Sequence, residues 1–362
     1  MKLGIVGLPG AGKTTIFNAL TKGNAPTGQS MGGRFDVLTA VVDVHDERVD
    51  VLSRMFNPKK TTYARITYTD VAGLQKGASE GGGMPGQLLN HLSGLDGFVH
   101  VVRAFESDVY PHPDGSVDPA RDLEALDTEF LLNDLGIVER RMLKLQEGLS
   151  KGAFKNKGEA QAELALFEMM NEALMAERPL RDLELTEEQL KSLRGYGLLT
   201  LKPTLVVINI GDDQDEIQLD YQHRLTTVVN LRGKLEMELA QLSAEGDEES
   251  LAMFMEEYGV TELSLDRVIR LSYDLMGLQS FFTVGEDEVR AWTVKRGATA
   301  VEAAGVIHSD LAKGFIRAEV IHYDDLVALG GMPQARAAGK LRLEGKTYIV
   351  QDGDIVHIKF NL

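Results

Sequence analysis

The chain has 362 residues, with 38 lysines and arginines against 55 aspartates and glutamates, a formal net charge of −17 and no cysteine. The missing cysteines exclude disulfide scaffolds, thiolate metal sites, iron–sulfur clusters and cysteine nucleophiles. The acidic excess argues against a protein that coats nucleic acid through lysine and arginine, so no DNA partner is expected.

No stretch of the sequence approaches the ~18 uninterrupted apolar residues that a membrane span requires. The N-terminus begins like a secretory leader, but it continues into Gly12-Lys13-Thr14-Thr15 without a small-residue cleavage site. We therefore expect no signal peptide, no membrane partner and a cytoplasmic location.

The first predicted elements are a short buried strand at residues 2–8, a glycine-rich turn and an amphipathic helix over residues 14–21. Further strands are predicted at residues 65–69, 98–102 and 204–208. Strands separated by helical patterns predict an α/β fold, in which a mostly parallel sheet has helices on both faces.

Between residues 122 and 178 the pattern becomes helical. Apolar residues recur three or four positions apart, as in a heptad seam, at Leu131, Leu135, Val138, Met142, Leu145 and Leu149. A polar linker at residues 150–158 and a second apolar stretch follow, and this stretch ends before Pro179. The pattern predicts an antiparallel, coiled-coil-like helical hairpin inserted between two strands of the sheet.

The C-terminal end has a different composition. Residues 278–362 contain 10 basic and 11 acidic residues, so they carry −1 and the first 277 residues carry the remaining −16. Residues 348–350, the Asp352-Gly353 turn and the alternating residues 355–360 predict a β-hairpin near the end of the chain.

These changes in residue pattern and charge along the chain predict that it has three parts. The first is a nucleotide-binding domain at residues 1–120 and 200–277. The second is the helical hairpin at residues 121–199, and the third is a strand-rich module at residues 278–362.

The segment from Gly7 to Thr14 matches the phosphate-loop pattern G-x-x-x-x-G-K-[ST], and it lies where that pattern works, after a strand and at the start of a helix. Its glycines let backbone N–H groups turn inward around a phosphate, and the helix N-terminus adds positive potential. Lys13 would reach the β- and γ-phosphate oxygens and act in catalysis, while the Thr14 hydroxyl would bind Mg²⁺. The predicted phosphate-binding residues here are Gly10, Ala11, Gly12, Lys13, Thr14 and Thr15.

A second phosphate element is predicted in Asp70-Val71-Ala72-Gly73. Asp70 at a strand end would hold Mg²⁺, and the Gly73 amide would sense a γ-phosphate. Leu74 follows, where Ras-like GTPases place the glutamine that orients the attacking water. Leucine cannot orient water, so either another group does so, or hydrolysis is slow until a partner or a conformational change helps. Alternatively, Leu74 is an ordinary core residue.

Several runs together closely resemble the Obg-like ATPases, the YchF subfamily of translation-factor-related P-loop NTPases. They include Leu8-Pro9, the stretch from Asp70 to Ser79, His100-Val101-Val102-Arg103, Lys313-Gly314-Phe315-Ile316-Arg317 and Asp352-Gly353-Asp354. The resemblance implies a nucleotide-binding domain interrupted by a helical hairpin and followed by a TGS domain, which is a β-grasp module. It also implies ATP hydrolysis, often in preference to GTP, association with ribosomes, and a histidine that assists hydrolysis, by position His112.

The resemblance leaves base recognition open. The family pattern after a Lys-Pro pair and a strand is N-x-x-E, whereas this chain has Asn209-Ile210-Gly211-Asp212. An aspartate can accept hydrogen bonds from both guanine N–H donors, so the residues permit GTP as well as ATP. The tripeptide Ser243-Ala244-Glu245 resembles the later base loop of the family.

The first switch departs most from the family. Family members have a Tyr-Pro-Phe-x-Thr-Ile-x-Pro stretch there, and in this chain Arg34 occupies the position of the threonine that closes over magnesium and the γ-phosphate. Thr27 or Thr39 would be a substitute. The alternatives for Arg34 are a contact to the γ-phosphate or a place on the surface.

The leading hypothesis is a cytoplasmic hydrolase of ATP or GTP with slow intrinsic turnover, whose nucleotide state controls docking to the ribosome or to structured RNA. The alternative is a nucleotide-dependent binding protein with negligible hydrolysis. A small-molecule kinase is disfavoured because the sequence has no arginine-rich lid. The candidate RNA-binding residues of the last module are Lys295, Arg296, Lys313 and Arg317.

Overall fold

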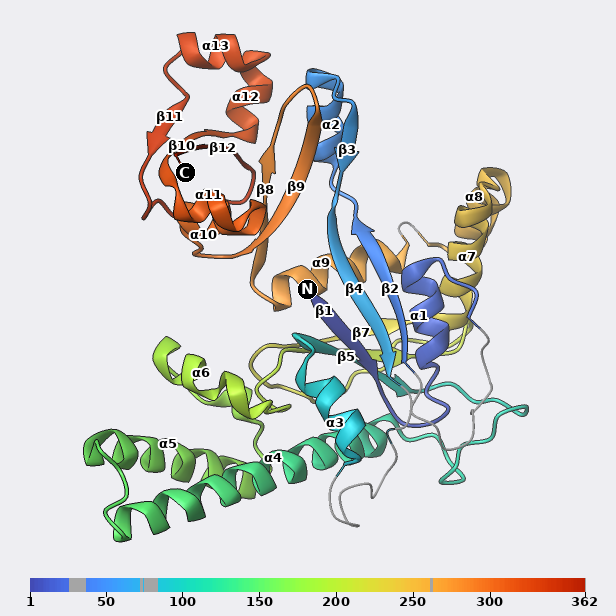
Figure 1. The fold of residues 1–362 in the computed structure, drawn as a ribbon. Helices are drawn as coiled ribbons and strands as arrows, with labels where there is room; N and C mark the ends of the chain where they lie inside the picture. Colours follow the sequence, from blue (N-terminus) through green and yellow to red (C-terminus); the bar gives the residue numbers. More distant parts are fainter. Residues whose placement is uncertain (26–36, 72–73, 75–83, 261–262, 362) are drawn as a thin grey trace. The chain divides into compact units, whose positions relative to one another are not determined.

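Six strands from the first part of the chain form one sheet, in the order β2-β4-β1-β5-β6-β7 (Figure 1). The computed structural model describes residues 1–25, 37–71, 74, 84–260 and 263–361. The strands of this sheet are β1 (Lys2–Val6), β2 (Val37–Val44), β4 (Ala64–Val71), β5 (Gly97–Arg103), β6 (Thr204–Asn209) and β7 (Thr226–Leu231). β1 pairs in parallel with β4 and β5, and β6 pairs in parallel with β5 and β7. The predicted mostly parallel sheet is confirmed.

The helices that accompany this sheet include the one that follows the glycine-rich turn and the inserted pair. They are α1 (Lys13–Thr21), α3 (Gly86–Ser93), α4 (Pro119–Ser150), α5 (Lys157–Met175), α6 (Glu187–Leu193), α7 (Gly233–Glu245) and α8 (Glu248–Glu257), with short 3-10 turns η1 (Leu180–Asp182) and η2 (Arg194–Tyr196). One face of the sheet packs on α3 and α4 through a cluster that contains Val6, Leu88, Phe98 and Phe130. α1 packs against α7. Among the described helices, none is both long and apolar enough to cross a membrane.

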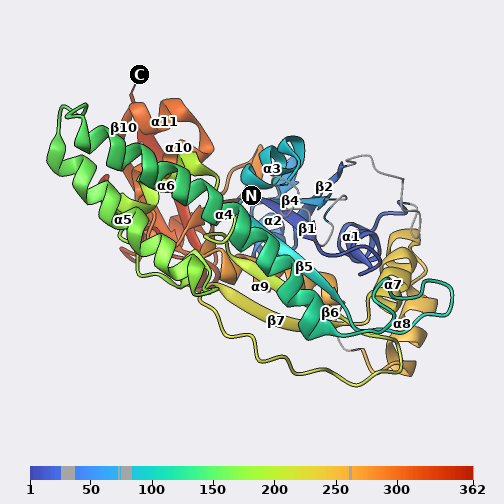
Figure 2. The ribbon, with the colours of Figure 1, turned by 90° about the horizontal axis from the view of Figure 1, so that it is seen from below.

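The inserted hairpin is confirmed: α4 and α5 lie side by side and are antiparallel, between β5 and β6 in the chain (Figure 2). Its own core includes Val138 of α4 together with Phe167 and Met170 of α5. α4 begins at Pro119 because the Asp118 side chain accepts a hydrogen bond from the Arg121 amide. A helix of this length extends about 48 Å.

A buried carboxylate fixes the hairpin to the sheet domain. Asp134 of α4 is fully buried and accepts hydrogen bonds from the amides of Leu199 and Thr200 at 3.0 and 2.8 Å, and from the Thr200 hydroxyl at 2.7 Å. Burial raises the pKa of Asp134, and these hydrogen bonds oppose that effect because they stabilise the carboxylate. The chain that leaves the hairpin is thereby tied to the helix that enters it.

The second sheet has the order β11-β10-β12-β8-β9-β3. Its strands are β3 (Lys60–Thr62), β8 (Leu278–Thr283), β9 (Glu288–Lys295), β10 (Phe315–His322), β11 (Arg342–Glu344) and β12 (Asp354–Phe360). The accompanying helices are α2 (Glu47–Phe56), α9 (Ser264–Leu275), α10 (Ala300–Ile307), α11 (Ser309–Lys313), α12 (Tyr323–Leu329) and α13 (Met332–Ala337). The parallel pair β8–β12, flanked by antiparallel β9 and β10, with α10 packed on one face, is a β-grasp arrangement.

The hairpin predicted near the C-terminus is wrong. Residues 348–350 form no strand, and Ile349 makes only an isolated bridge with Thr299. β12 instead pairs antiparallel with β10 and parallel with β8. The turn at Asp352-Gly353 has another use, because the Asp352 carboxylate accepts a hydrogen bond from the Ser280 amide of β8 at 2.9 Å.

The chain divides into two compact units, which are Met1–Ala40 with Thr67–Leu265, and Val41–Ile66 with Asp266–Leu362. The boundaries predicted from composition assign residues 41–66 to the nucleotide-binding domain. In the structure, Val49 and Leu52 of α2 are part of the second unit's core, and β3 pairs with β9. The apolar face of α2, together with Ala64 of β4, therefore completes a core whose other buried residues are more than 200 positions away in the sequence.

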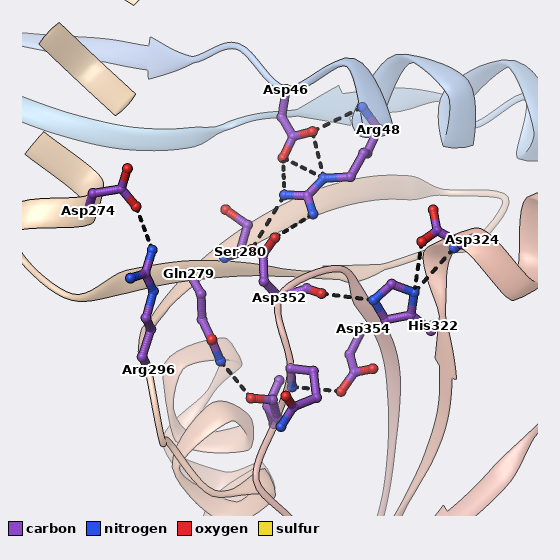
Figure 3. A network of polar contacts seen from close by, with 12 residues as sticks. Asp46, Arg48, Asp274, Gln279, Ser280, Arg296, His322, Asp324, Asp352 and Asp354 are labelled. Atoms are coloured by element: carbon purple, nitrogen blue, oxygen red, sulfur yellow. Dashed lines mark hydrogen bonds and ion pairs between the residues drawn. The ribbon is translucent and has the colours of Figure 1, made fainter. Parts of the chain in front are cut away.

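A charged network also holds α2 to this core (Figure 3). The Arg48 guanidinium donates hydrogen bonds to Asp46 at 2.8 Å and to Asp352 at 2.7 Å, and it lies over the Phe282 ring, 5.0 Å from its centroid. These two carboxylates hold the pKa of Arg48 above its usual value, although burial opposes the shift. Arg48 thus joins the two chain segments that form the unit.

Arg48→Ala is expected to destabilise the full-length protein by about 2 kcal/mol, because it removes the stacking contact and leaves two carboxylates without their cation. Urea-induced unfolding would measure the loss. The matched control is Lys59→Ala, which breaks an ion pair to Asp287 whose side chains are 81% and 87% exposed. That change should cost less than about 0.5 kcal/mol, and equal effects of the two variants would contradict the assigned role of Arg48.

Candidate nucleotide-binding site

The predicted phosphate loop lies between β1 and α1. Gly12 caps α1 in the left-handed region at φ 89°, and no side chain caps the helix. The first amides of a helix have no partner within the helix, so those of Lys13, Thr14 and Thr15 can bind an anion together with the helix's positive end. The predicted residues 10–15 are therefore brought together in the arrangement that a phosphate requires.

Lys13 is half-buried, and within the described ranges no carboxylate forms an ion pair with it. Its ammonium donates to the Leu8 carbonyl at 3.0 Å. Burial lowers the pKa of Lys13, and the charge of Asp70 opposes the shift only in part. A half-buried cation whose described hydrogen-bond partner is a single carbonyl is suited to an anionic ligand, because phosphate oxygens would complete its set of partners.

Thr14 and Asp70 meet, as predicted. The Thr14 hydroxyl donates to Asp70 Oδ2 at 2.7 Å, while the buried Oδ1 of Asp70 accepts no hydrogen bond. Burial raises the pKa of Asp70, against the stabilising effects of the Thr14 hydrogen bond and the Lys13 charge. A hard cation beside these oxygens would hold the carboxylate in its ionised form.

Asn209 joins the phosphate loop to the segment after β7. Its amide nitrogen donates to the Ala11 carbonyl at 3.0 Å, and its carbonyl oxygen accepts from the Gly233 amide at 3.0 Å. A Cβ at Gly12 would lie 2.2 Å from the Asn209 amide nitrogen, and a Cβ at Gly233 would lie 2.5 Å from its oxygen. Both glycines are therefore required by the Asn209 side chain, which connects the predicted phosphate and base regions.

Asp212 lies three residues further on. Its buried Oδ1 accepts no hydrogen bond, and its Oδ2 is 3.9 Å from the Lys234 ammonium. Sequence reasoning missed Gly233 and Lys234, which follow β7 directly. They could have been found from their position, because they follow the carboxyl end of β7, and ligands of parallel sheets bind at the carboxyl ends of the strands.

The loop predicted at Ser243, Ala244 and Glu245 is wrong. These residues form the last turn of α7, and the Ser243 hydroxyl accepts a hydrogen bond from Lys22 at the C-terminal end of α1. The phosphate loop is at the opposite end of α1. The tripeptide pattern carried no information about secondary structure, whereas the buried Leu239 and Ala240 continue the helix up to it.

His112 uses both of its ring nitrogens in hydrogen bonds. Its Nε2 is 2.7 Å from Asp122 Oδ2, and its Nδ1 accepts from the Asp114 amide at 3.1 Å, so Nε2 donates to Asp122. His112 lines a small cavity together with Leu8 and Pro9 of the phosphate loop. The histidine predicted to assist hydrolysis is thus beside the loop, but a carboxylate of α4 holds it.

Arg103, at the end of β5, supports the loop that carries His112. It is 2% exposed, donates to the carbonyls of Phe105 and Tyr110, and lies over the Phe105 ring. Its Nη1 is also within 3.3 Å of where a Cβ at Gly10 would lie. The sequence marks Arg103 only as part of a family motif, and the structure shows that it packs between the phosphate loop and the loop at residues 105–110.

Leu74 is 1% exposed and belongs to the core cluster of Val6 and Phe98, which agrees with its interpretation as a core residue. The Thr39 hydroxyl lies 3.5 Å from that of Thr69. Gly73, Thr27 and Arg34 lie outside the described residues.

His100, in the middle of β5, gives the domain a specific sensitivity to acid. It is 2% exposed, and burial, together with the charges of Arg181 and Lys13, lowers its pKa from 6.5 to about 3. Between these two values the unfolded chain binds a proton that the folded chain does not. Stability therefore falls as the pH falls through this window.

Going from pH 7.5 to pH 5.0, His100 should account for about 2 kcal/mol of lost stability. His100→Gln cannot be protonated, so the stability difference between the two proteins should change by that amount over this range. Urea-induced unfolding at both pH values measures it. Parallel pH dependences for the two proteins would show that His100 does not titrate as proposed.

A phosphate loop between the first strand and helix of a mostly parallel sheet places this protein in the class of P-loop nucleoside triphosphatases. A model described as "50S ribosome-binding GTPase" matches residues 2–139, and the YchF-GTPase_C model, described as "Protein of unknown function (DUF933)", matches residues 278–361. The chain is 43% identical to the "Ribosome-binding ATPase YchF" of Bacillus subtilis, over 99% of both chains. It is 41% identical to the protein of the same name from Escherichia coli O157:H7, over 100% of this chain and 99% of that one.

A solved structure agrees with these relatives. The YchF GTPase of Schizosaccharomyces pombe superposes with a TM-score of 0.81 at 32% identity, covering 99% of this chain and 97% of that chain. The chain belongs to the YchF family.

Proposed function

We propose that the protein binds ATP or GTP at the phosphate loop, hydrolyses it with Mg²⁺, and uses its nucleotide state to control association with the ribosome. The observation that carries the proposal is the partly buried set of Lys13, Thr14 and Asp70, in which a cation and a carboxylate both have incomplete partners among the described residues. The relatives from Bacillus subtilis and Escherichia coli, named ribosome-binding ATPases, support the enzymatic and the ribosomal parts. Because ribosomes are in the cytoplasm, we propose that the protein is cytoplasmic.

The donor set fits magnesium. Mg²⁺ prefers oxygen ligands and usually keeps several waters, so the Thr14 hydroxyl and the Asp70 carboxylate, together with phosphate oxygens, would hold it. When bound, the ion would neutralise charge on the β- and γ-phosphates. Lys13 and the first amides of α1 would bind the same phosphates from the protein side, and the Gly73 amide is proposed for the γ-phosphate.

The base site is proposed at Asn209 and Asp212, with the segment at Gly233 and Lys234 beside them. Asn209 positions this segment against the phosphate loop, and Asp212 Oδ1 is the acceptor left open for a base N–H group. We propose three functional parts, which are the nucleotide-binding domain at residues 1–120 and 200–277, the inserted hairpin at residues 121–199 and the C-terminal module at residues 278–362. Residues 41–66 of the first part pack with the C-terminal module in one compact unit.

We propose that intrinsic hydrolysis is slow, and two of the described residues support this. The Leu74 side chain is in the core, and His112 is bound to Asp122, so neither orients a water in this arrangement. Catalysis then depends on positioning and on charge stabilisation by Lys13 and the loop amides. A partner that moves α4 would free His112.

A second candidate function follows from the same hydrogen bond. If His112 stays on Asp122 when nucleotide is bound, the protein is a nucleotide-dependent binding protein with negligible turnover. Single-turnover hydrolysis measured against the nucleotide dissociation rate separates the two functions. Hydrolysis faster than dissociation supports the enzyme, and dissociation that is always faster supports the binding protein.

The decisive experiment measures phosphate release from ATP and from GTP, each with Mg²⁺ and with EDTA, with and without 70S ribosomes. We expect Mg²⁺-dependent turnover that ribosomes stimulate, and co-sedimentation with ribosomes that differs between a non-hydrolysable analogue and the diphosphate. Turnover that is indifferent to Mg²⁺ would contradict the roles of Thr14 and Asp70. Co-sedimentation that is indifferent to nucleotide would contradict the switch.

A further inference from the structure

The second unit contains an open hollow of about 370 Å³, far along the chain from the phosphate loop. Its wall is formed by the start and end of the helical segment between β10 and β11 and by the turn before β12. The lining residues are His322, Asp325, Gly339, Lys340, Arg342, Gln351 and Asp354. A volume of this order holds a small molecule.

The buried side of the hollow is a carboxylate with one unsatisfied oxygen. The Asp354 side chain is 1% exposed, and its Oδ2 accepts hydrogen bonds from the Tyr348 hydroxyl and the Gln351 amide, both at 2.8 Å. Its Oδ1 is buried and accepts none, and the Nη2 of Arg342 lies 3.9 Å from it. A buried carboxylate oxygen without a hydrogen bond is costly, so this atom favours a ligand that brings an N–H donor.

The exposed side of the hollow carries a cation that is held in place. Arg342 is 48% exposed, lies over the Tyr348 ring at 5.3 Å from its centroid, and donates to the Tyr348 hydroxyl at 2.9 Å. A guanidinium fixed by stacking is a suitable partner for a planar carboxylate. The Arg342 Nε also lies 3.7 Å from Glu344, and Lys340 pairs with Asp325 at 3.0 Å.

The His322 ring forms a fixed part of the wall. Its Nε2 is 3.0 Å from the Asp352 carbonyl, and its Nδ1 accepts from the Asp324 amide at 3.4 Å (Figure 3). Gln351 likewise donates its side-chain amide to the Ile349 carbonyl at 2.8 Å. The groups left to bind a ligand are therefore Asp354 Oδ1 and the Nη1 side of the Arg342 guanidinium, since its Nη2 donates to Tyr348 and its Nε is paired with Glu344.

The charges of the hollow decide the class of ligand. The positive charges of Lys340 and Arg342 equal in number the negative charges of Asp325 and Asp354. A phosphorylated ligand with several negative charges would be repelled by the two carboxylates, and a simple amine would be repelled by the two cations. A ligand with one positive and one negative group next to each other matches both open partners. We propose that this hollow binds a free α-amino acid, whose ammonium group donates to Asp354 Oδ1 and whose carboxylate binds Arg342.

Isothermal titration calorimetry of the full-length protein with each of the twenty L-amino acids tests the proposal. We expect at least one of them to bind with a stoichiometry of one. Its decarboxylated amine and its N-acetyl derivative should bind at least tenfold more weakly, because each lacks one of the two charges. Failure of every amino acid to bind at millimolar concentration would overturn the proposal, as would equal binding of the amine or the N-acetyl derivative.

Variants locate the binding. Arg342→Gln should weaken it at least tenfold, whereas Arg336→Gln, which replaces an exposed arginine outside the hollow, should leave it unchanged. Asp354 also fixes the turn before β12, so Asp354→Asn is used only if circular dichroism shows that it is folded. If it is not folded, Arg342→Gln alone tests the site.

A nucleotide control uses the Lys13→Ala variant, in which the phosphate loop is impaired, and nucleoside monophosphates are titrated into it. Tighter binding of a nucleotide there than of any amino acid would overturn the assignment.

Discussion

Replacing Lys13 with alanine is expected to weaken nucleoside triphosphate binding by about 100- to 10,000-fold, because two charge-assisted hydrogen bonds to phosphate are lost at about 1.5–3 kcal/mol each. The ligand-free protein should lose little stability, since in the part of the chain that the structure describes the half-buried Lys13 ammonium donates only to the Leu8 carbonyl, and its partial burial already disfavours the charge. Affinity and thermal stability should therefore change independently. Fluorescence titration with labelled ATP and GTP, together with thermal unfolding, measures both.

The matched control is Lys22→Ala, at the other end of α1. Lys22 is exposed, and its ammonium donates to the Ser243 hydroxyl at 3.0 Å, away from the phosphate loop. Its removal should change triphosphate affinity by less than a factor of two, on the scale of surface substitutions of about 0.5 kcal/mol. Unaltered binding by Lys13→Ala, or equal losses in both variants, would contradict the assigned phosphate site.

Asp212→Asn is expected to lower affinity for GTP by about 10- to 100-fold, the value of a hydrogen bond to a charged acceptor. Guanine presents two neighbouring N–H donors to a carboxylate, whereas adenine presents one amino group beside a ring acceptor. The loss for ATP should therefore be clearly smaller. The asparagine amide can donate to a carbonyl, so the variant should gain affinity for xanthosine triphosphate.

Competition binding with the three triphosphates gives these ratios directly. Lys234→Met is the comparison, because its ammonium is 3.9 Å from Asp212 and 71% of its side chain is exposed. It should affect all three nucleotides alike and only slightly. Equal losses for GTP and ATP in Asp212→Asn would show that Oδ1 does not contact the base.

The phosphate site could be predicted because it is local in sequence. Gly12, Lys13 and Thr14 are adjacent, and their spacing alone forces the amides, the ammonium and the hydroxyl to one place. Asp70 could be added because strand ends of a parallel sheet meet at one edge. Asn209 was assigned to the base, and the structure adds its hydrogen bonds to Ala11 and Gly233.

Contacts between distant segments could not be predicted in the same way. The hydrogen bond between His112 and Asp122 depends on where α4 begins relative to the preceding loop, and a single sequence does not show it. The partner of β12 was missed because adjacency favours a hairpin, whereas the turn at Asp352 serves β8. The short tripeptide at Ser243 was assigned by likeness, and helix periodicity in α7 is the stronger signal.

The composition of the second unit has a practical consequence for anyone who isolates the C-terminal domain. The family model begins at residue 278, but α2 and β3 belong to the same unit. A fragment cut at that point would leave β9 with an open edge and would uncover the apolar surface that Val49 and Leu52 protect. Such a fragment is expected to aggregate or to recruit foreign strands, and supplying residues 41–66 as a separate peptide should make it soluble.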